Sequence, residues 1–243
     1  MVSVNIIIFL FCVAGTHSAL PEGWSACKHS SPGYEECLKQ QINNAILFLK
    51  NGNSKMSMIP LEPLRFETMV IEQGSGPVSV TMKMHHVLLQ GLSDSKVTSV
   101  KNDWKKMFIK FHTPHSGTAG DYIGKGQVLQ LKLNGTGKFS LDYENLDYSF
   151  DINFKQITKD GKKYFQVDKM SVGISPQKVV IYVENLFSDN KEMGDNMNKF
   201  LNENWRVIIE EMKPTISRKL GEVYSQYINR ILSQIPAQEI DVK

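Results

Sequence analysis

The sequence lacks any block of like charge. Its 28 lysine and arginine residues are interspersed with 25 aspartate and glutamate residues, which leaves a formal net charge of only +3. Proteins that bind nucleic acids gather their basic residues into a patch or a stripe, so we expect no nucleic-acid partner. The composition, 41% apolar and 22% charged, is that of an ordinary globular protein.

The sequence also lacks an apolar run long enough to cross a membrane. The run at residues 6–14 has nine residues, whereas a spanning helix needs about 20. Residues 1–18 contain no charged side chain, and small and polar residues follow. This pattern predicts a secretory signal peptide over residues 1–18, cleaved near Ser18 or Ala19, and hence an extracellular protein. The positive charge usual at the start of such a peptide is missing, and a buried core helix is the alternative.

Cysteine is scarce, with three residues in the chain. Cys12 lies within the predicted signal peptide, which leaves Cys27 and Cys37 as the only possible pair. In an oxidising compartment such a pair predicts a disulfide, and closing so short a loop would stabilise the fold by about 2–3 kcal/mol. Two free buried thiols are the alternative. Only His29 lies nearby, so a zinc site is not expected.

No motif carries recognisable catalytic chemistry. His112 and His115 lie in a predicted Pro-containing loop without nearby carboxylates, so we expect no metal site there. The Gly-rich segment 120–126 has Gly126 where a phosphate-binding loop requires Ser or Thr, and no nucleophile elbow is found. We therefore expect neither enzymatic activity nor a cofactor.

The segment Asn134-Gly135-Thr136 is a sequon for N-glycosylation. Asn-Gly is also typical of a tight hairpin turn. Both interpretations place Asn134 at the surface.

A helix is predicted over residues 32–51. Ser31 can cap its first turn, Pro32 suits the first helical position, and Glu35 and Glu36 favour the positive end of the helix dipole. Gly52 supplies the end of the helix. The apolar residues at helical spacing are Leu38, Ile42, Ala45, Ile46 and Leu49.

Residues 56–187 place apolar side chains at every second position, as in strands with one buried face. The alternation changes phase across His85-His86 and across Glu144-Asn145, as β-bulges would cause, and bulges bend a sheet. Asp160-Gly161 predicts a hairpin turn. We therefore expect long antiparallel strands in a strongly curved sheet, which must wrap around another element.

The C-terminal segment supplies a helix for that role. Asp189 to Glu192 resembles a capping box, and apolar residues then recur at steps of three or four as far as Ile231. We expect one helix from there to about Ser233, roughly 60 Å long if straight, kinked at Pro214 and closed by Pro236. A coiled coil is the alternative. The apolar residues are Met197, Leu201, Trp205, Ile208, Met212, Ile216, Leu220, Val223, Tyr227 and Ile231.

These elements predict an α+β fold in which a strongly curved antiparallel β-sheet wraps a long C-terminal α-helix, with a short N-terminal helix. No linker-like segment and no internal repeat divides the chain. We therefore expect residues 19–243 to form a single domain.

The chain resembles the takeout / juvenile-hormone-binding protein family of insects. The strongest match is Asn185-Leu186-Phe187 followed by residues 191–205, and Glu211 and Pro214 fit its continuation. Supporting matches are Cys27, Cys37, Ile59-Pro60-Leu61-Glu62-Pro63-Leu64, Gly91-Leu92-Ser93 and Gly135-Thr136-Gly137-Lys138-Phe139.

This resemblance implies a lipid-transfer-protein-like half-barrel with an elongated internal hydrophobic tunnel, which binds juvenile hormone or another lipid-like molecule. It also implies an insect haemolymph protein with a circadian or feeding-related role. Juvenile-hormone-binding proteins proper tend to carry a second disulfide. This chain has one cysteine pair and so sits nearer the takeout branch, which weakens juvenile hormone itself as the ligand.

We therefore predict a secreted, monomeric carrier of a small hydrophobic ligand such as juvenile hormone, a terpenoid or a fatty-acid-like lipid. An empty tunnel and a packed core share one sequence pattern, so core packing is the alternative role for each tunnel-lining candidate. The competing function is a protein with a collapsed cavity that acts through transient receptor or membrane contact. The tunnel-lining candidates are Ile46 and Leu49 at the gated end, Met82, Met84, Phe150, Trp205, Ile208 and Met212, with Tyr224 and Tyr227 as polar contacts.

Overall fold

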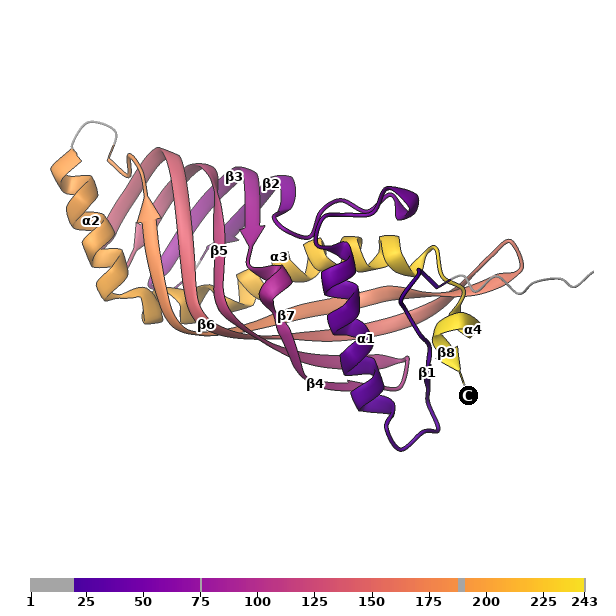
Figure 1. The fold of residues 1–243 in the computed structure, drawn as a ribbon. Helices are drawn as coiled ribbons and strands as arrows, with labels where there is room; N and C mark the ends of the chain where they lie inside the picture. Colours follow the sequence, from indigo (N-terminus) through magenta and orange to yellow (C-terminus); the bar gives the residue numbers. More distant parts are fainter. Residues whose placement is uncertain (1–19, 75, 188–190, 243) are drawn as a thin grey trace, which may run out of the picture.

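A curved antiparallel sheet wrapped around a long helix forms the body of the molecule (Figure 1). The computed structural model describes residues 20–74, 76–187 and 191–242, so the predicted signal peptide lies outside the described residues. The six strands are ordered β2-β3-β5-β6-β7, and β4 pairs with β5 outside this path. The predicted α+β architecture is confirmed. The strands are β2 (Leu64–Gln73), β3 (Val78–Gln90), β4 (Lys96–Asn102), β5 (Lys106–Val128), β6 (Leu131–Lys159) and β7 (Lys162–Val183).

The predicted phase change at His85-His86 is a β-bulge, whereas the one at Glu144-Asn145 occurs without a bulge. The pairing of β3 with β5 shifts between His85 and Leu88, with His86 at φ 50°. Asn145 also has a left-handed φ of 47°, but no shift in register occurs there in either ladder of β6. Buried positions change phase at the same level in all three paired strands β5, β6 and β7. The expectation of a bulge at Asn145 was therefore wrong, because the whole three-stranded segment changes phase together.

One predicted hairpin turn is confirmed and the other is not. Asp160 and Gly161, at φ 50° and 73°, connect β6 to β7. Asn134 and Gly135 lie within β6, opposite Lys125 and Gly124, and the chain turns instead at Leu129, φ 53°. Gly135 is required for close approach of another segment and not for a turn. A Cβ there would lie 2.3 Å from the carbonyl oxygen of Asn185, so this glycine lets the segment after β7 cross the strand. Asn134 is exposed, as predicted.

The N-terminal helix is α1 (Tyr34–Leu49), which begins two residues later than predicted. Its cap is Gly33, and no side chain bonds to the first turn. The Ser31 hydroxyl accepts a hydrogen bond from the Gly33 N–H at 3.4 Å, so Ser31 and Pro32 form a turn before the helix. The predicted cap at Ser31 was therefore wrong.

A disulfide joins Cys27 to Cys37 and ties α1 to the segment before it, as predicted. That segment contains β1 (Cys27–Lys28), which pairs in parallel with β8 (Asp241–Val242) at the C-terminal end. The other face of α1 lies against β4, where the Asn43 side-chain oxygen accepts a hydrogen bond from the Val97 N–H at 3.0 Å. Helix α1 is thus held by the leader on one side and by an edge strand on the other. The shorter elements are η1 (Ser54–Met56), η2 (Leu92–Asp94) and α4 (Ala237–Ile240).

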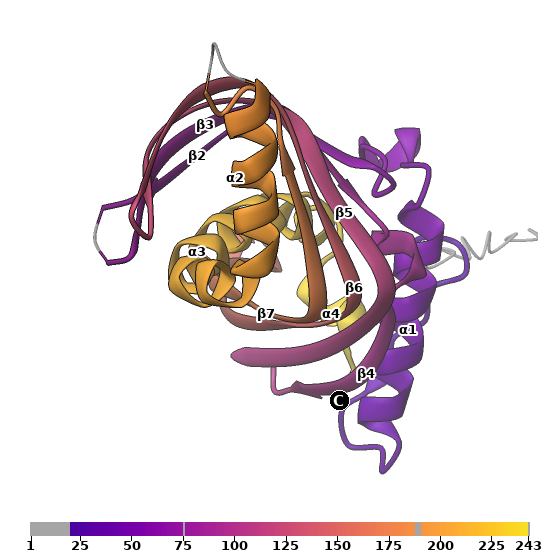
Figure 2. The same ribbon diagram turned by 90° about the vertical axis from the view of Figure 1, so that its left-hand side faces the viewer.

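The predicted single C-terminal helix is two helices, α2 (Lys191–Glu203) and α3 (Trp205–Leu232). The predicted cap at Asp189 lies outside the described residues. Asn204, with φ −111° and ψ 13°, interrupts the helix, and its side-chain amide donates to the Phe200 carbonyl at 2.8 Å. Helix α3 runs along the concave face of the sheet through Pro214, while α2 turns across the end of the sheet (Figure 2). Because α3 packs on β7, the coiled-coil alternative is excluded.

Two asparagines fasten α2 to the edge of β7. The Asn198 amide accepts from the Val183 N–H at 2.8 Å and donates to the Val183 carbonyl at 2.9 Å. Asn202 repeats both bonds with Ile181, at 2.9 and 2.7 Å. Asparagines four apart share a helix face, and alternate residues of a strand share an edge orientation. The two side chains therefore act in place of a neighbouring strand.

Candidate ligand-binding cavities

Three cavities follow one another along α3. The first, about 270 Å³, is bordered by the C-terminal part of the helix from Tyr224 onward. The second, about 140 Å³, is bordered by Ile208, Met212 and Ile216. A smaller one of about 50 Å³ lies between them and shares Tyr224 with the first and Ile216 with the second. Helix α3 is therefore a common wall of all three, which together follow the long axis of the fold.

The first cavity, here called the α1 cavity, lies beneath α1. Its roof is the inner face of that helix, including Leu38, Ile42 and Ala45, and its floor is the aromatic row on strands β5 and β6. Rings of Phe111 and Tyr148 stack at 4.6 Å within this row. Because nearly all of the wall is apolar, the cavity suits an apolar occupant.

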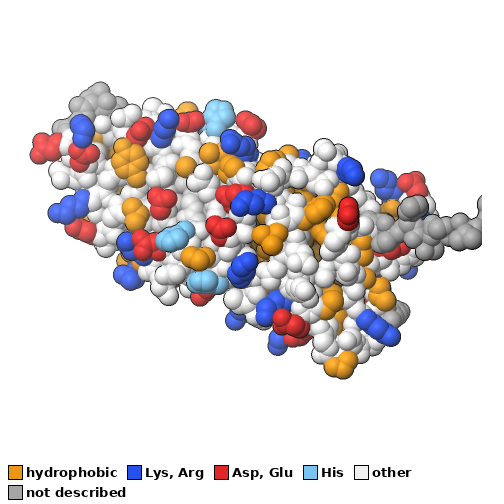
Figure 3. Space-filling view, viewed as in Figure 1, with side chains coloured by type: hydrophobic (Ala, Val, Ile, Leu, Met, Phe, Trp, Pro, Cys, Tyr) orange, Lys and Arg blue, Asp and Glu red, His pale blue; other side chains and the backbone are white. Residues whose placement is uncertain are grey.

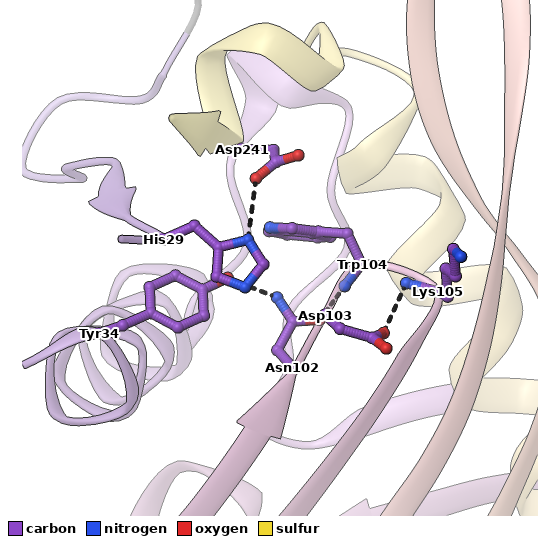
Figure 4. A network of polar contacts seen from close by, with 7 residues as sticks. All are labelled: His29, Tyr34, Asn102, Asp103, Trp104, Lys105 and Asp241. Carbon is purple, nitrogen blue, oxygen red and sulfur yellow. Dashed lines mark hydrogen bonds and ion pairs between the residues drawn. The ribbon is translucent and has the colours of Figure 1, made fainter. Parts of the chain in front are cut away.

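A polar cluster around Trp104, which borders the α1 cavity, lies where the leader meets the C-terminal segment (Figure 4). His29 stacks on Tyr34 with ring centroids 4.6 Å apart, and its Nδ1 lies 3.6 Å from Asp241 Oδ1. The Tyr34 hydroxyl accepts from Asn102 at 2.8 Å. Burial raises the pKa of Tyr34. The cluster joins the residue after β1 to α1 and β8, and its bond between Tyr34 and Asn102 fixes the roof to β4.

The second cavity, here called the α2-end cavity, lies between α3 and strands β2, β3 and β5. Thioethers of Met82, Met84 and Met212 line it, and such side chains adapt to irregular shapes. Lys125 is the charged residue in its wall.

Nine of the ten predicted tunnel-lining residues border a cavity, and they divide into two groups. Those at the α1 cavity are Ile46, Leu49, Phe150, Tyr224 and Tyr227. Those at the α2-end cavity are Met82, Met84, Ile208 and Met212. Trp205 borders none of these three cavities. It is the first residue of α3, and the Arg206 guanidinium lies 4.7 Å from its ring centroid.

Sequence reasoning missed two parts of the α1 cavity. The leader contributes Leu20, Trp24 and Cys27, and the C-terminal end contributes Ile235 and Ile240. These segments carry no periodic pattern. They reach the cavity because β1 pairs with β8, a contact between opposite ends of the chain.

The middle cavity is the polar part of the series. It is bordered by the side chains of Ser116, Thr118, Tyr143, Tyr148 and Tyr224. Burial raises the pKa of Tyr143 to about 12, against a hydrogen bond with Thr118 that lowers it. Burial likewise raises the pKa of Tyr148 to about 12, opposed by a hydrogen bond with Ser95. These phenols are therefore neutral at every physiological pH.

We predict that stability falls in strong alkali because of these tyrosines. The pKa values of Tyr122, Tyr143, Tyr148 and Tyr227 rise to about 12 in the folded protein, chiefly through burial, whereas an unfolded chain ionises near 10. The contribution is fully present below pH 10 and is lost as the pH rises through 12. Urea unfolding across this range checks the fall, and phenolate absorbance of the folded protein should lag behind that of the unfolded protein. Coincident absorbance titrations would contradict the prediction.

The histidine pair lies in strand β5, not in a loop, and His112 has a carboxylate partner. Its Nδ1 lies 2.8 Å from Asp147 Oδ1 on β6. The expected absence of nearby carboxylates was therefore wrong, because the pairing of β5 with β6 brings Asp147 opposite His112. In the described part of the chain, no group of three or more His, Cys, Asp or Glu residues is arranged to hold a metal.

The surface charges are mixed, as the balanced composition suggests. Figure 3 shows acidic and basic side chains interspersed on one face, with apolar side chains gathered around α1. Leu47 on the outer side of α1 is 55% exposed. Among the described residues, no helix has the length and apolar character that a bilayer crossing requires.

Comparison with known proteins finds a matching family model and similar proteins in insects. Residues 6–240 match the family model described as haemolymph juvenile hormone binding protein. The circadian clock-controlled protein daywake of Drosophila melanogaster is 24% identical, with 98% of this chain and 95% of the relative covered. The "Putative beta-carotene-binding protein" of Schistocerca gregaria is 19% identical over 85% of this chain and 83% of its own.

A solved structure shows the same fold. The crystal structure of Epiphyas postvittana Takeout 1 superposes with a TM-score of 0.75 at 22% identity, covering 89% of this chain and 99% of the other.

Proposed function

The chain belongs to the haemolymph juvenile hormone binding protein family, and on that premise we propose that it is a secreted carrier which encloses one small hydrophobic molecule between α3 and the sheet. The observation that carries this proposal is the pair of apolar cavities at either end of α3. Well-packed protein interiors leave few voids larger than a water molecule. Space of this size, lined by aliphatic, aromatic and thioether groups, is what an apolar guest requires.

The driving force would be removal of the guest from water. Burial of apolar surface contributes about 25 cal/mol per Å², and affinities from micromolar to nanomolar follow after the costs of association. Polar contacts would add selectivity. The Tyr227 hydroxyl is already bonded to the Ile59 carbonyl at 3.1 Å, which leaves Tyr224 as the stronger candidate of the two predicted tyrosines.

The α1 cavity is the proposed point of access. Its roof is a single helix, and Ile46 and Leu49 on that helix face the cavity. The predicted signal peptide and the Cys27–Cys37 disulfide support secretion, since disulfides persist in oxidising compartments. The relative named for beta-carotene binding supports an elongated apolar guest. The carrier is proposed to work as a monomer without catalysis or cofactor.

Native mass spectrometry of the protein purified from insect cells tests this function. We expect either a co-purifying hydrophobic molecule or uptake of one equivalent of a fluorescent fatty-acid probe, displaced by terpenoids, juvenile hormone or fatty acids. A protein that is empty and takes up no probe would overturn carriage and favour an interaction protein of the same fold.

A further inference from the structure

The three cavities along α3, here together called the channel, differ in the chemistry of their walls. Both end cavities are lined almost wholly by apolar groups, whereas five hydroxyl-bearing side chains border the middle one. Buried hydroxyl groups need partners, because leaving one unpaired costs free energy. The partner of each hydroxyl therefore shows which of them is available to a guest.

Four of these hydroxyls have partners within the protein. Ser116 donates to the Gln90 carbonyl at 2.8 Å. Tyr143 is hydrogen-bonded with Thr118, and Tyr148 with Ser95. These groups form the wall and are not free to bind.

Tyr224 differs from them. Its side chain is only 8% exposed, and it borders both the middle and the α1 cavity. Within the described residues, no hydrogen bond joins its hydroxyl to another group. Its ring is held by Phe150, with centroids 4.8 Å apart, and burial keeps its pKa well above the usual value. A fixed, neutral O–H donor therefore stands where the α1 cavity adjoins the middle cavity.

We propose that the channel takes a long-chain ester, a molecule whose acceptor oxygen lies between two apolar chains, and that Tyr224 donates a hydrogen bond to this oxygen. The inference rests on the proposed carrier function and specifies its ligand class. From Ile208 to Tyr224 the helix rises about 24 Å, and from Tyr224 to Leu232 about 12 Å. An oxygen bonded to Tyr224 therefore has apolar space on both sides of it.

Other ligand classes fit the polar and apolar parts of the channel less well. A hydrocarbon leaves the Tyr224 hydroxyl without a partner. A lipid with its polar group at one end places that group in an apolar end cavity when both cavities are filled. A carboxylate at Tyr224 would be buried without a cation, because no charged residue borders the middle or the α1 cavity.

Two isomeric esters separate these cases. Dodecyl laurate has its ester near the middle of the chain, whereas methyl tricosanoate has the same atoms and length with the ester at one end. Pentacosane is the hydrocarbon of matching length. Each is delivered from cyclodextrin to the delipidated full chain, and competition is measured by native mass spectrometry.

We expect dodecyl laurate to bind roughly five- to tenfold more tightly than the other two, which is the effect of about one hydrogen bond. Tyr224→Phe should abolish this preference while binding of pentacosane persists. Tyr182→Phe is the matched control, because Tyr182 is 50% exposed and borders none of the three cavities, and it should keep the preference for the central ester.

The outcomes are distinguishable from failure of the carrier function. Equal binding of all three probes would overturn the ester proposal and leave carriage standing. A preference that survives Tyr224→Phe would also overturn it. Binding of none of the probes, including the fatty-acid probe, would overturn both.

Discussion

Replacing Asn198 and Asn202 together by alanine is expected to lower the free energy of unfolding by about 2–4 kcal/mol. Four hydrogen bonds to the edge of β7 are lost, those to the N–H and carbonyl groups of Ile181 and Val183. Alanine is a better helix former than asparagine, by several tenths of a kcal/mol per residue. The expected loss is therefore the net effect of the missing bonds.

Asn196→Ala on the same helix is the matched control, because Asn196 is exposed. It should change stability by no more than about 0.5 kcal/mol. Urea unfolding gives the free energies, and hydrogen exchange at the Ile181 and Val183 amides reports whether α2 has left the edge. A double variant as stable as the control, with both amides still protected, would show that the edge does not need α2.

Ala45→Trp is expected to reduce binding of the fatty-acid probe at least tenfold. Ala45 is a small residue in the roof of the α1 cavity, and an indole there would occupy space that the guest needs. The fold should tolerate the change because the ring enters a cavity of about 270 Å³, and overpacking costs only about 1–3 kcal/mol in a filled core.

Leu47→Trp places the same side chain two residues away on the exposed side of α1 and should leave binding unchanged. Leu133→Trp projects instead into the α2-end cavity and should weaken long ligands more than short ones. Fluorescence titration measures binding, and urea unfolding confirms that each variant is folded. Undiminished probe binding by folded Ala45→Trp would remove the α1 cavity from the proposed site.

Periodicity was enough to predict the main elements of the fold. The alternation around Val78 to Met84 and around Leu146 to Phe154 indicates strands with one buried face, and the three- and four-residue steps from Ile208 to Ile231 indicate a helix. The phase change at His85-His86 correctly indicated a bend. Each of these patterns is local. The structure agrees with them because burial of one apolar face determines whether such a segment forms a strand or a helix.

The break between α2 and α3 could not be predicted from the same pattern. Met197, Leu201, Trp205 and Ile208 keep helical spacing across Asn204, so the apolar residues alone favour continuity. The helix breaks at Asn204, and α2 then bonds to the edge of β7 through Asn198 and Asn202, a contact that helical spacing does not indicate. The hairpin wrongly placed at Asn134-Gly135 has the same origin, because the glycine is required by a crossing segment rather than by a turn.

The division of the channel was also beyond sequence reasoning. Met212 and Tyr227 lie on the same helix and satisfy the same pattern, yet they border different cavities. Which hydroxyl remains without a partner depends on Ser95, Thr118 and Gln90, residues that only the folded sheet brings near. The sequence indicated which side chains face the interior, and the structure shows which groups each of them contacts.

Helix α1 has a second role that follows from its contact with β4. Among the described strands, β4 pairs with β5 alone, and its other side faces α1, where the Asn43 side chain accepts a hydrogen bond from the Val97 N–H. Unpaired strand edges recruit further strands from other molecules. Any lifting of α1 that admits a guest would therefore also expose a site for self-association, and solubility at high concentration would depend on how briefly the roof stays open.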